Sequence, residues 1–338
     1  MSGWIQKTAT TMVAVLGLGL LAACGSEANK QNGASTQSAS ASTAGENAQA
    51  STEAGAATNA QTRTVRDEFG EVTVPAHPKR IAAIYLEDYL KALDITPVVQ
   101  WYNPMWGKQD YLNLDVPLFD NSGSIEALLA QTPDLIILDG AVDRAAYDQY
   151  SKVAPTFRLP EAILQSPDQI LKTIADVVGV PEKAESVAAA YEAKVADAKA
   201  KLAQAVGQET VAVIRVNVGD RTIALFGAKN RYAGSILFDE LGLTPHPMVE
   251  KMTEFQEILS EEAFSMLDAD HIIVIPSNGD WQTAENQDAF TLLDSPMWKS
   301  VPAFKNGHVY KVDRSYWQSG AITANGMKID DLLKLMVK

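Results

Sequence analysis

The sequence of 338 residues is poor in cysteine and histidine, and its basic side chains are outnumbered by acidic ones. Cys24 is the only cysteine, so one chain has no cysteine pair for a disulfide or a redox centre. The four histidines are scattered, and so few of them argue against a direct zinc or manganese receptor, so no direct metal ligand is assigned from the sequence. His271 stands inside an apolar run and is interpreted as a hydrogen-bonded core residue. The formal net charge of −14 argues against nucleic acid as a partner.

Signatures of catalysis are also missing. The chain contains no G-x-S-x-G, no H-E-x-x-H and no phosphate-binding loop, so we do not expect an enzyme. The absence of these motifs favours a protein that binds a solute. The alternative from another functional class is an adhesin or a scaffold. Because an acidic surface does not attract anionic ligands in general, any anion site must be made locally by particular arginines or lysines.

The apolar run near the N-terminus, Met12–Leu21, is about half of the roughly 20 residues that a membrane-spanning helix needs. It follows Lys7 and precedes small residues, so residues 1–23 are interpreted as a signal peptide. The segment LAAC resembles the lipobox of bacterial lipoproteins. This implies a diacylglycerol on Cys24 and an exported protein anchored to the outer face of the cytoplasmic membrane; a free thiol is the alternative.

After the signal peptide, the sequence predicts a disordered tether and then a folded body. Residues 24–62 consist mostly of Ala, Ser, Thr, Gly, Asn and Gln, without an aromatic residue or a periodic apolar pattern. Such a segment cannot bury a core, and a tether between membrane and body is the plainest interpretation. The remaining residues, 63–338, are enough for two lobes.

The pattern in residues 63–181 predicts an α/β lobe with a parallel sheet. Short apolar runs at Ile81–Tyr85, Pro97–Val99 and Leu135–Leu138 are interpreted as strands. Helical segments lie between them, one capped by Ser124, and a further helix begins at Ser166-Pro167. Strands that alternate with helices favour parallel pairing.

Residues 182–206 form a long Ala-, Lys- and Glu-rich run without Gly or Pro, which predicts one helix of roughly 37 Å between two lobes. The α/β pattern then restarts in residues 207–338. The phrase SIEALLAQTPDLIIL in the first half is echoed by LSEEAFSMLDADHIIVI in the second. This repetition indicates that a similar lobe was built twice.

Six phrases in order resemble the periplasmic-binding-protein family that serves iron-siderophore ABC importers: VTVPAHPKRI, SIEALLAQTPDLIIL, KVAPTF, GSILFDELGL, LSEEAFSMLDADHIIVI and MWKSVPAFKNGHVYKVD. The resemblance implies two Rossmann-like α/β lobes joined by one long rigid helix, with a ligand cleft between them. It implies a monomer that captures a ferric siderophore and delivers it to ABC permease subunits. A haem or cobalamin receptor on the same fold is the alternative; for haem, His246 is the candidate axial ligand.

Arg215 is the first cationic candidate for the ligand site, because it interrupts a strand that is otherwise apolar. A lone buried charge is costly, so the guanidinium must either reach the end of the strand or form an ion pair. It either meets the ligand, as the resemblance implies, or forms an ion pair between the lobes. Asn217 points the same way; similar catecholate-binding proteins have a second cation there, so hydroxamate or citrate-type siderophores are favoured over tris-catecholates. Arg231 lies in a loop that in the family opens on the cleft, or else on the surface at a helix start.

Aromatic candidates follow predicted strands. Trp101, Tyr102 and Trp106, with Lys108 close behind, are expected in a loop at the ligand edge, with packing of the lobe as the alternative. The resemblance adds three weaker ligand candidates near strand ends: Tyr85, Tyr316 and Trp317.

Glu126 and Glu262 occupy matching places in the two repeated phrases. In the family, one exposed glutamate on each lobe docks on arginines of the permease, and these two are the residues that the resemblance assigns. By themselves they are ordinary acids in the first turn of a helix. Glu261 is the neighbouring alternative in the second lobe.

Overall fold

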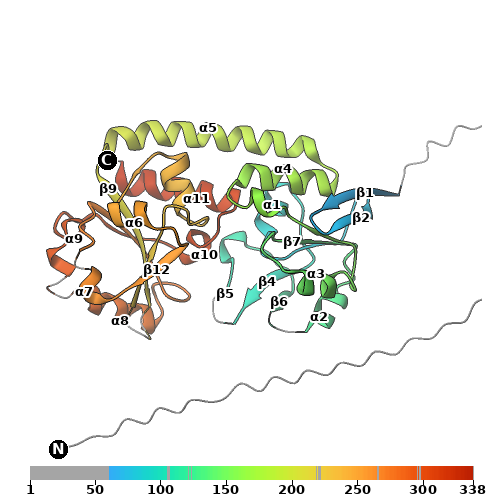
Figure 1. The fold of residues 1–338 in the computed structure, drawn as a ribbon, viewed down its shortest axis with the longest axis horizontal. Coiled ribbons are helices and arrows are strands. Elements are labelled where there is room, and N and C mark those ends of the chain that lie inside the picture. Colours follow the sequence, from blue (N-terminus) through green and yellow to red (C-terminus); the bar gives the residue numbers. More distant parts are fainter. Residues whose placement is uncertain are drawn as a thin grey trace, which may run out of the picture. The chain divides into compact units, whose positions relative to one another are not determined.

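A computed structural model shows two α/β lobes beneath one long helix, α5 (Pro181–Ala205) (Figure 1). The structure describes residues 61–337 except 105–106, 121, 123, 218, 220–221, 265, 295 and 297. These residues fall within one compact unit, Thr58–Lys338. The expected signal peptide, the lipidated Cys24 and nearly all of the expected tether lie outside the described residues. Within the expected tether, Thr62 already belongs to a strand, β1.

The N lobe (residues 62–180) opens with an antiparallel hairpin that turns at Gly70, where φ is +141°. Its central sheet is parallel in the order β3-β7-β8, as the sequence predicts, and a second small sheet has the order β5-β4-β6. The strands are β1 (Thr62–Asp67), β2 (Gly70–Pro75), β3 (Ile81–Ala83), β4 (Gln100–Asn103), β5 (Gly107–Lys108), β6 (Leu118–Asp120), β7 (Leu135–Leu138) and β8 (Thr156–Arg158).

The strand predicted at Pro97–Val99 is displaced in the structure. The backbone N–H of Val98 donates to the carbonyl of Ile81, but the regular strand, β4, begins at Gln100. Trp101 and Tyr102 therefore belong to a strand and not to a loop after one. Apolar periodicity located the extended segment, while its pairing with β5 and β6 decided where the strand begins.

Helices of the N lobe begin where the sequence indicates. Ser124 accepts a hydrogen bond from the N–H of Glu126, and Ser166 accepts one from the N–H of Gln169, next to Pro167 at the first helical position. The helices are α1 (Glu87–Ala92), α2 (Ile125–Leu129), α3 (Arg144–Tyr150) and α4 (Pro167–Val178), with 3-10 turns at Asp110–Leu112 and Glu161–Ile163.

The central strands of both lobes, such as β7, β9 and β13, are apolar on both faces because a core layer lies on either side of them. In β7, Leu135 and Ile137 belong to one buried cluster, and Ile136 and Leu138 belong to the other. Alternate residues of β9 and β13 divide in the same way in the C lobe. This double burial is why the strands read as continuous apolar runs.

The C lobe (residues 206–320) has a mixed sheet in the order β12-β10-β9-β13-β14, with β11 beside β9. β9, β13 and β14 are parallel, whereas β10 is antiparallel to both β9 and β12. The lobe therefore repeats the parallel unit of the N lobe and adds an antiparallel extension. The strands are β9 (Thr210–Asn217), β10 (Thr222–Phe226), β11 (Thr244–Pro245), β12 (Gln256–Leu259), β13 (His271–Ile275) and β14 (Val309–Lys311).

Most helices of this half are short. The segment between β10 and β11 contains a π-helix, Ser235–Glu240. The α-helices are α6 (Pro247–Lys251), α7 (Glu261–Phe264), α8 (Ala284–Leu293), α9 (Pro302–Lys305), α10 (Arg314–Trp317) and α11 (Ile322–Met336), with a 3-10 turn at Trp298–Ser300.

Two helices connect the lobes. α5 packs on α4 and α11, with Ala184 in the N-lobe core and Leu202 in the C-lobe core. α11 also contributes to both cores: Ile322 belongs to the N-lobe core and Leu332 belongs to the C-lobe core. The predicted division of the body at α5 therefore needs a correction: part of residues 207–338 completes the N lobe. In the part of the chain that the structure describes, no helix is both long and apolar enough to cross a bilayer.

Candidate functional site

A cavity of about 960 Å³ lies between the two lobes and is lined by residues of both. Tyr85 follows β3 and Asp139 follows β7, whereas Arg215 lies near the end of β9 and Arg314 begins α10, three residues after β14. The cavity therefore sits at the carboxyl ends of the parallel strands of both lobes, which is the usual ligand position in open α/β sheets. We call it the cleft.

Five of the residues expected to bind ligand line the cleft: Tyr85, Trp101, Lys108, Arg215 and Arg231. Tyr85 and Trp101 form an edge-to-face pair with ring centroids 4.7 Å apart. The Tyr85 hydroxyl also donates to the carbonyl of Gln318, 2.6 Å away, which links the lobes across the cleft floor. Tyr85 has a φ of +62°, a sparsely populated backbone conformation for a bulky residue.

Two arginines lie close together on the C-lobe wall. Arg314 is 5% exposed and donates to the carbonyls of Pro276, at 3.1 Å, and Ser277. Burial, together with the charge of Arg215, lowers the pKa of Arg314 to about 10. The same wall carries Phe226, whose ring lies 5.9 Å from the Arg215 guanidinium carbon. An anionic group placed here would offset the repulsion between these two like charges.

Arg231 extends from the C lobe to Asp139 of the N lobe, with Nη1 3.0 Å from Oδ2. Burial by itself lowers the pKa of Arg231, but the charge of Asp139 together with contributions from Tyr232 and Tyr85 raises the pKa of the guanidinium above its ordinary value. Arg231 therefore forms an ion pair between the two lobes. Arg231 lies inside the cleft and not at an exposed helix start.

The arrangement of two lobes around a cleft has counterparts among known proteins. The family described as "Periplasmic binding protein" matches residues 88–316, which include parts of both lobes and all of α5. The chain belongs to this family. Its members are substrate-binding proteins and not enzymes, in agreement with the missing catalytic motifs.

Relatives of this periplasmic binding protein are similar along most of their length. It is 31% identical to the iron(3+)-hydroxamate-binding protein FhuD of Bacillus subtilis, over 91% of this chain and 90% of the relative. It is 30% identical to the probable siderophore-binding lipoprotein YfiY of the same species, over 83% of this chain and 89% of the relative.

Among solved structures, a FhuD fold-family periplasmic binding protein component of a Fep/Fec-like ferrichrome ABC transporter from Bacillus subtilis superimposes with a TM-score of 0.67. The two chains are 26% identical, and the match covers 81% of this chain and 100% of the other. The two-lobe fold predicted from the sequence is thereby confirmed.

Asn217 does not line the cleft of this periplasmic binding protein. Its Oδ1 accepts a hydrogen bond from Nε of Arg215 at 3.0 Å, and its Nδ2 donates to Thr222 at 3.1 Å. As expected, Asn217 lies on the same side of the strand as Arg215. Its contact is with Arg215, so it orients the guanidinium at the C-lobe wall.

Other candidates lie elsewhere. Tyr102 is half-buried in β4, opposite Lys108 of β5, and does not line the cleft. Trp106 lies outside the described residues. Trp317 has no exposed surface: it lies in the C-lobe core, and its Nε1 donates to Asp331 at 2.9 Å. The expectation that Trp317 contacts ligand is therefore wrong.

The hydroxyl of Tyr316 donates to the same carboxylate, Asp331, at 2.7 Å. Tyr316 is half-buried and is also absent from the cleft lining. The physical reason is that α10 packs on α11, which carries Asp331, so both rings turn toward that helix. The sequence indicated a segment beside the cleft, but not which of its faces is buried.

Several cleft residues were missed by sequence reasoning. The basic one is Arg314, which follows the strand Val309–Lys311 and could have been found from the rule that strand ends face the ligand. Aromatic and acidic ones are more difficult to find, because they are brought together from separate segments. They include Tyr150, Phe226, Phe255, Asp139 and Asp143.

His246, the candidate axial ligand for haem, is buried outside the cleft. Its Nδ1 accepts a hydrogen bond from the N–H of Met248, so it caps α6. Its Nε2 lies 2.8 Å from Oδ1 of Asp268. Because both ring nitrogens are engaged and neither faces the cleft, the proposed haem ligand is wrong.

Of the two expected docking glutamates, Glu126 is exposed at the start of α2. Ser124 donates to its carboxylate, and this hydrogen bond, together with the helix start, lowers the pKa of Glu126. Glu126 is therefore a fixed negative charge on the N-lobe surface. Glu262 belongs to α7 of the C lobe, and its side chain lies outside the described atoms.

Proposed function

We propose that this protein captures a ferric siderophore in the cleft and delivers it to an ABC permease. The observation that carries this proposal is a cavity of about 960 Å³ that is lined by arginines and by several aromatic rings. Ferric siderophores are bulky complexes, and fixed cations with flat apolar surfaces provide contacts to them. The names of FhuD and YfiY, a hydroxamate- and a siderophore-binding protein, support the same ligand class.

Within this class we propose a hydroxamate or citrate-type siderophore over a tris-catecholate. Among the described residues that line the cleft, four carry cationic side chains and five are aspartates: Asp110, Asp139, Asp143, Asp280 and Asp313. A nearly balanced set of charges disfavours a highly anionic complex, because every added negative charge on the ligand meets these carboxylates. Asn217, a neutral residue beside Arg215, points to the same preference.

A panel of ferric siderophores tests the ligand class through quenching of tryptophan fluorescence. We expect a hydroxamate or citrate complex to bind with a Kd below about 1 μM, near −8 kcal/mol, and a tris-catecholate at least about tenfold more weakly. Trp101→Phe should reduce the quenching amplitude, because Trp101 lines the cleft. If no siderophore binds below that threshold while haemin or cobalamin does, the alternative receptor function replaces this proposal.

Delivery is proposed to use Glu126 on the N lobe and Glu262 on the C lobe as contacts to arginines of the permease. Glu126→Ala combined with Glu262→Ala should abolish siderophore uptake by cells and leave the Kd of the purified protein unchanged. The matched control replaces Glu185 and Glu192, two exposed glutamates of α5, by alanine. Unchanged uptake in the first double variant would remove this assignment.

The membrane anchor is proposed to be a lipid on Cys24. Tethering would keep the carrier at a high effective concentration beside its permease. Cys24→Ala should release the protein from the membrane fraction and prevent incorporation of labelled palmitate. Retention of the variant in washed membranes would contradict a lipid anchor.

A further inference from the structure

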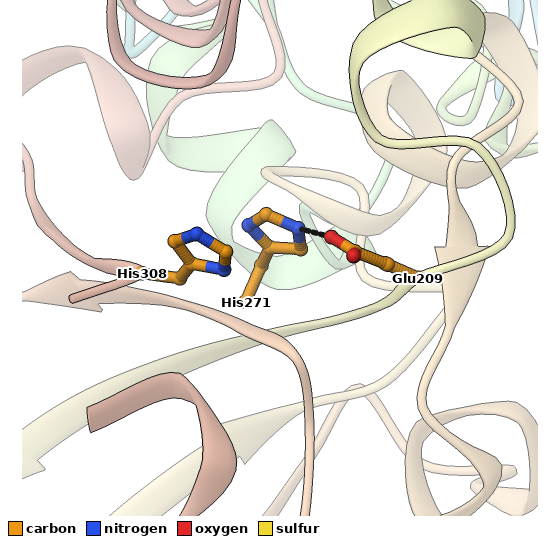
Figure 2. Close-up of side chains that lie close together, drawn as sticks. All are labelled: Glu209, His271 and His308. Carbon is orange, nitrogen blue, oxygen red and sulfur yellow. Dashed lines mark hydrogen bonds and ion pairs between the residues drawn. The ribbon is translucent and has the colours of Figure 1, made fainter. Parts of the chain in front are cut away.

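Three potential metal ligands meet at the edge of the C-lobe sheet that is opposite the cleft: Glu209, His271 and His308 (Figure 2). Glu209 directly precedes β9, His271 begins β13, and His308 directly precedes β14. The amino ends of these parallel strands therefore bring the three side chains together, whereas their carboxyl ends carry the cleft. The cluster is separate from the ligand site, and its chemistry is independent of the proposed function.

His271 is buried and has both ring nitrogens engaged. Its Nε2 lies 2.6 Å from Oε2 of Glu209, as the dashed line in Figure 2 marks, and its Nδ1 lies 3.0 Å from the hydroxyl of Tyr310. The ring of His308 stacks on that of His271, with centroids 4.5 Å apart and planes inclined by 3°. One ligand atom from each of the three residues lies within 4.8 Å of the other two.

An ordinary buried histidine–carboxylate pair accounts for His271 and Glu209, and it fits the core role that the sequence suggests for His271. It does not account for His308. Nδ1 of His308 is shielded from solvent and has no hydrogen-bond partner among the described residues. A buried polar atom without a partner is unfavourable, so its position beside a second imidazole and a carboxylate requires another explanation.

We propose that Glu209, His271 and His308 bind a divalent transition-metal ion, with Zn²⁺ as the best match. Two imidazole nitrogens and one carboxylate oxygen are a frequent set of three zinc ligands, and water completes the tetrahedron. Calcium and magnesium prefer oxygen ligands and fit this set poorly. Tyr310 supplies the outer hydrogen bond that metal-binding histidines usually make, because it holds Nδ1 of His271 while Nε2 faces Glu209.

Binding requires small movements that the structure permits. Ligand atoms of one tetrahedral Zn²⁺ lie about 3.2 to 3.6 Å apart, whereas Nε2 of His271 and Oε2 of Glu209 are 2.6 Å apart. The nearly parallel rings cannot both direct an in-plane nitrogen to one ion, so one ring must turn. The Glu209 side chain is 51% exposed and His308 is only half-buried, so both can adjust while Tyr310 holds His271.

An ion at this position would join three segments. Glu209 lies four residues after the end of α5, so the metal would attach the exit of the connecting helix to β13 and β14. Because a metal that binds only the folded state stabilises that state, Zn²⁺ should raise the resistance of the C lobe to unfolding. No sequence motif indicates such a site, because the three residues are separated by 62 and 37 positions along the chain.

The experiment is a Zn²⁺ titration of the full-length chain, purified without a histidine tag, by calorimetry at pH 7.5. We expect one ion per chain with a Kd below about 10 μM. Glu209→Gln and His308→Ala should each weaken binding at least about tenfold, whereas His77→Ala, at an exposed histidine of the N lobe, should not change it.

Spectroscopy gives a second measurement. Co²⁺ bound to the wild-type chain should show the visible absorption of a tetrahedral nitrogen and oxygen site, and His308→Ala should remove it. A wild-type Kd for Zn²⁺ weaker than about 10 μM would overturn the proposal. Equal Zn²⁺ affinity in the wild type and in both Glu209→Gln and His308→Ala would also overturn it, since the ion would then occupy another part of the chain.

Discussion

Arg231 of the C lobe and Asp139 of the N lobe form an ion pair across the cleft, with Nη1 3.0 Å from Oδ2. Both side chains are largely buried, with 23% and 14% of their surface exposed. The pair holds a cation in position before ligand arrives, and it also places a carboxylate where an anionic ligand would compete for that cation. Asp139 is therefore expected to limit the affinity for anions while it supports the empty cleft.

The first prediction concerns Asp139→Asn. Removing this negative charge should strengthen binding of an anionic ferric citrate complex several-fold, because Arg231 is released and one repulsion disappears. A neutral hydroxamate complex should bind with nearly unchanged affinity. Fluorescence titration with both complexes measures the difference. Weaker binding of the anionic complex would show that the ion pair is needed to shape the cleft.

The second prediction concerns Arg314, the arginine that sequence reasoning missed. Arg314→Met keeps an apolar side chain of similar length but removes the charge beside Arg215, so an anionic ferric complex should bind about tenfold more weakly, near 1.4 kcal/mol. Arg144→Met, at an exposed arginine of α3 that pairs with Asp148, is the matched control. If both variants retain the wild-type Kd, Arg314 has no role in ligand binding.

The third prediction concerns the start of α11, which lacks a cap from its own segment. Asp88 of α1 supplies it instead: its carboxylate accepts the N–H groups of Thr323 and Ala324 at 3.0 and 3.1 Å. The hydroxyl of Tyr111 also donates to Asp88 at 2.7 Å. Asp88→Ala should therefore lower the free energy of unfolding by about 2 to 4 kcal/mol.

Urea unfolding measures this loss, and Asp148→Ala, at an exposed aspartate of α3, is the control with an expected change within about 0.5 kcal/mol. Because α11 contributes to the cores of both lobes, the whole described body should lose stability and not one lobe alone. Equal stability of Asp88→Ala and Asp148→Ala would contradict the capping role.

The fourth prediction is a pH dependence set by two buried groups with opposite signs. Burial raises the pKa of Glu87 to about 8, although the hydrogen bond that its carboxylate accepts from the N–H of Trp101 acts in the opposite direction and lowers this pKa. The folded protein then holds a proton that the unfolded chain releases, so stability falls as pH rises from about 4.5 to 8. Burial lowers the pKa of Lys328 to about 7, so stability rises with pH from about 7 to 10.5.

Variants separate the two contributions. Glu87→Gln should gain stability relative to the wild type as pH rises, by about 3 kcal/mol between pH 5 and 8. Lys328→Met should show its largest relative gain below pH 7 and lose that gain toward pH 10. Urea unfolding at pH 5, 6.5, 8 and 9.5 provides both profiles. If the difference in unfolding free energy between a variant and the wild type stays constant from pH 5 to 9.5, the titration assigned to the replaced residue is wrong.

Local signals in the sequence predicted the helices well. Ser124 and Ser166 cap helices as expected, Pro167 stands at a first helical position, and the Ala-rich run forms one long helix, displaced by only one residue at each end. Capping and periodicity act between residues a few positions apart, so they are readable without the fold. The strand predicted at Pro97–Val99 failed because strand limits depend on partners distant in sequence.

The candidate site was predictable in its cations and less so in its aromatic rings. Arg215 was conspicuous because an arginine inside an apolar strand has few acceptable positions. Trp317 carried no such signal, since a tryptophan is equally suited to a core and to a ligand site. Its burial against α11 follows from the packing of α10, which no local pattern specifies.

Composition and short-range periodicity were enough to predict two α/β lobes, one long connecting helix and a protein without catalytic motifs. The pairing of Arg231 with Asp139, the position of Arg314 beside Arg215 and the contribution of α11 to both cores became visible only in the folded chain. The same is true of His271 and His308 beside Glu209. These relationships join residues far apart along the chain, and only the packing of the sheets and helices sets the distances between them.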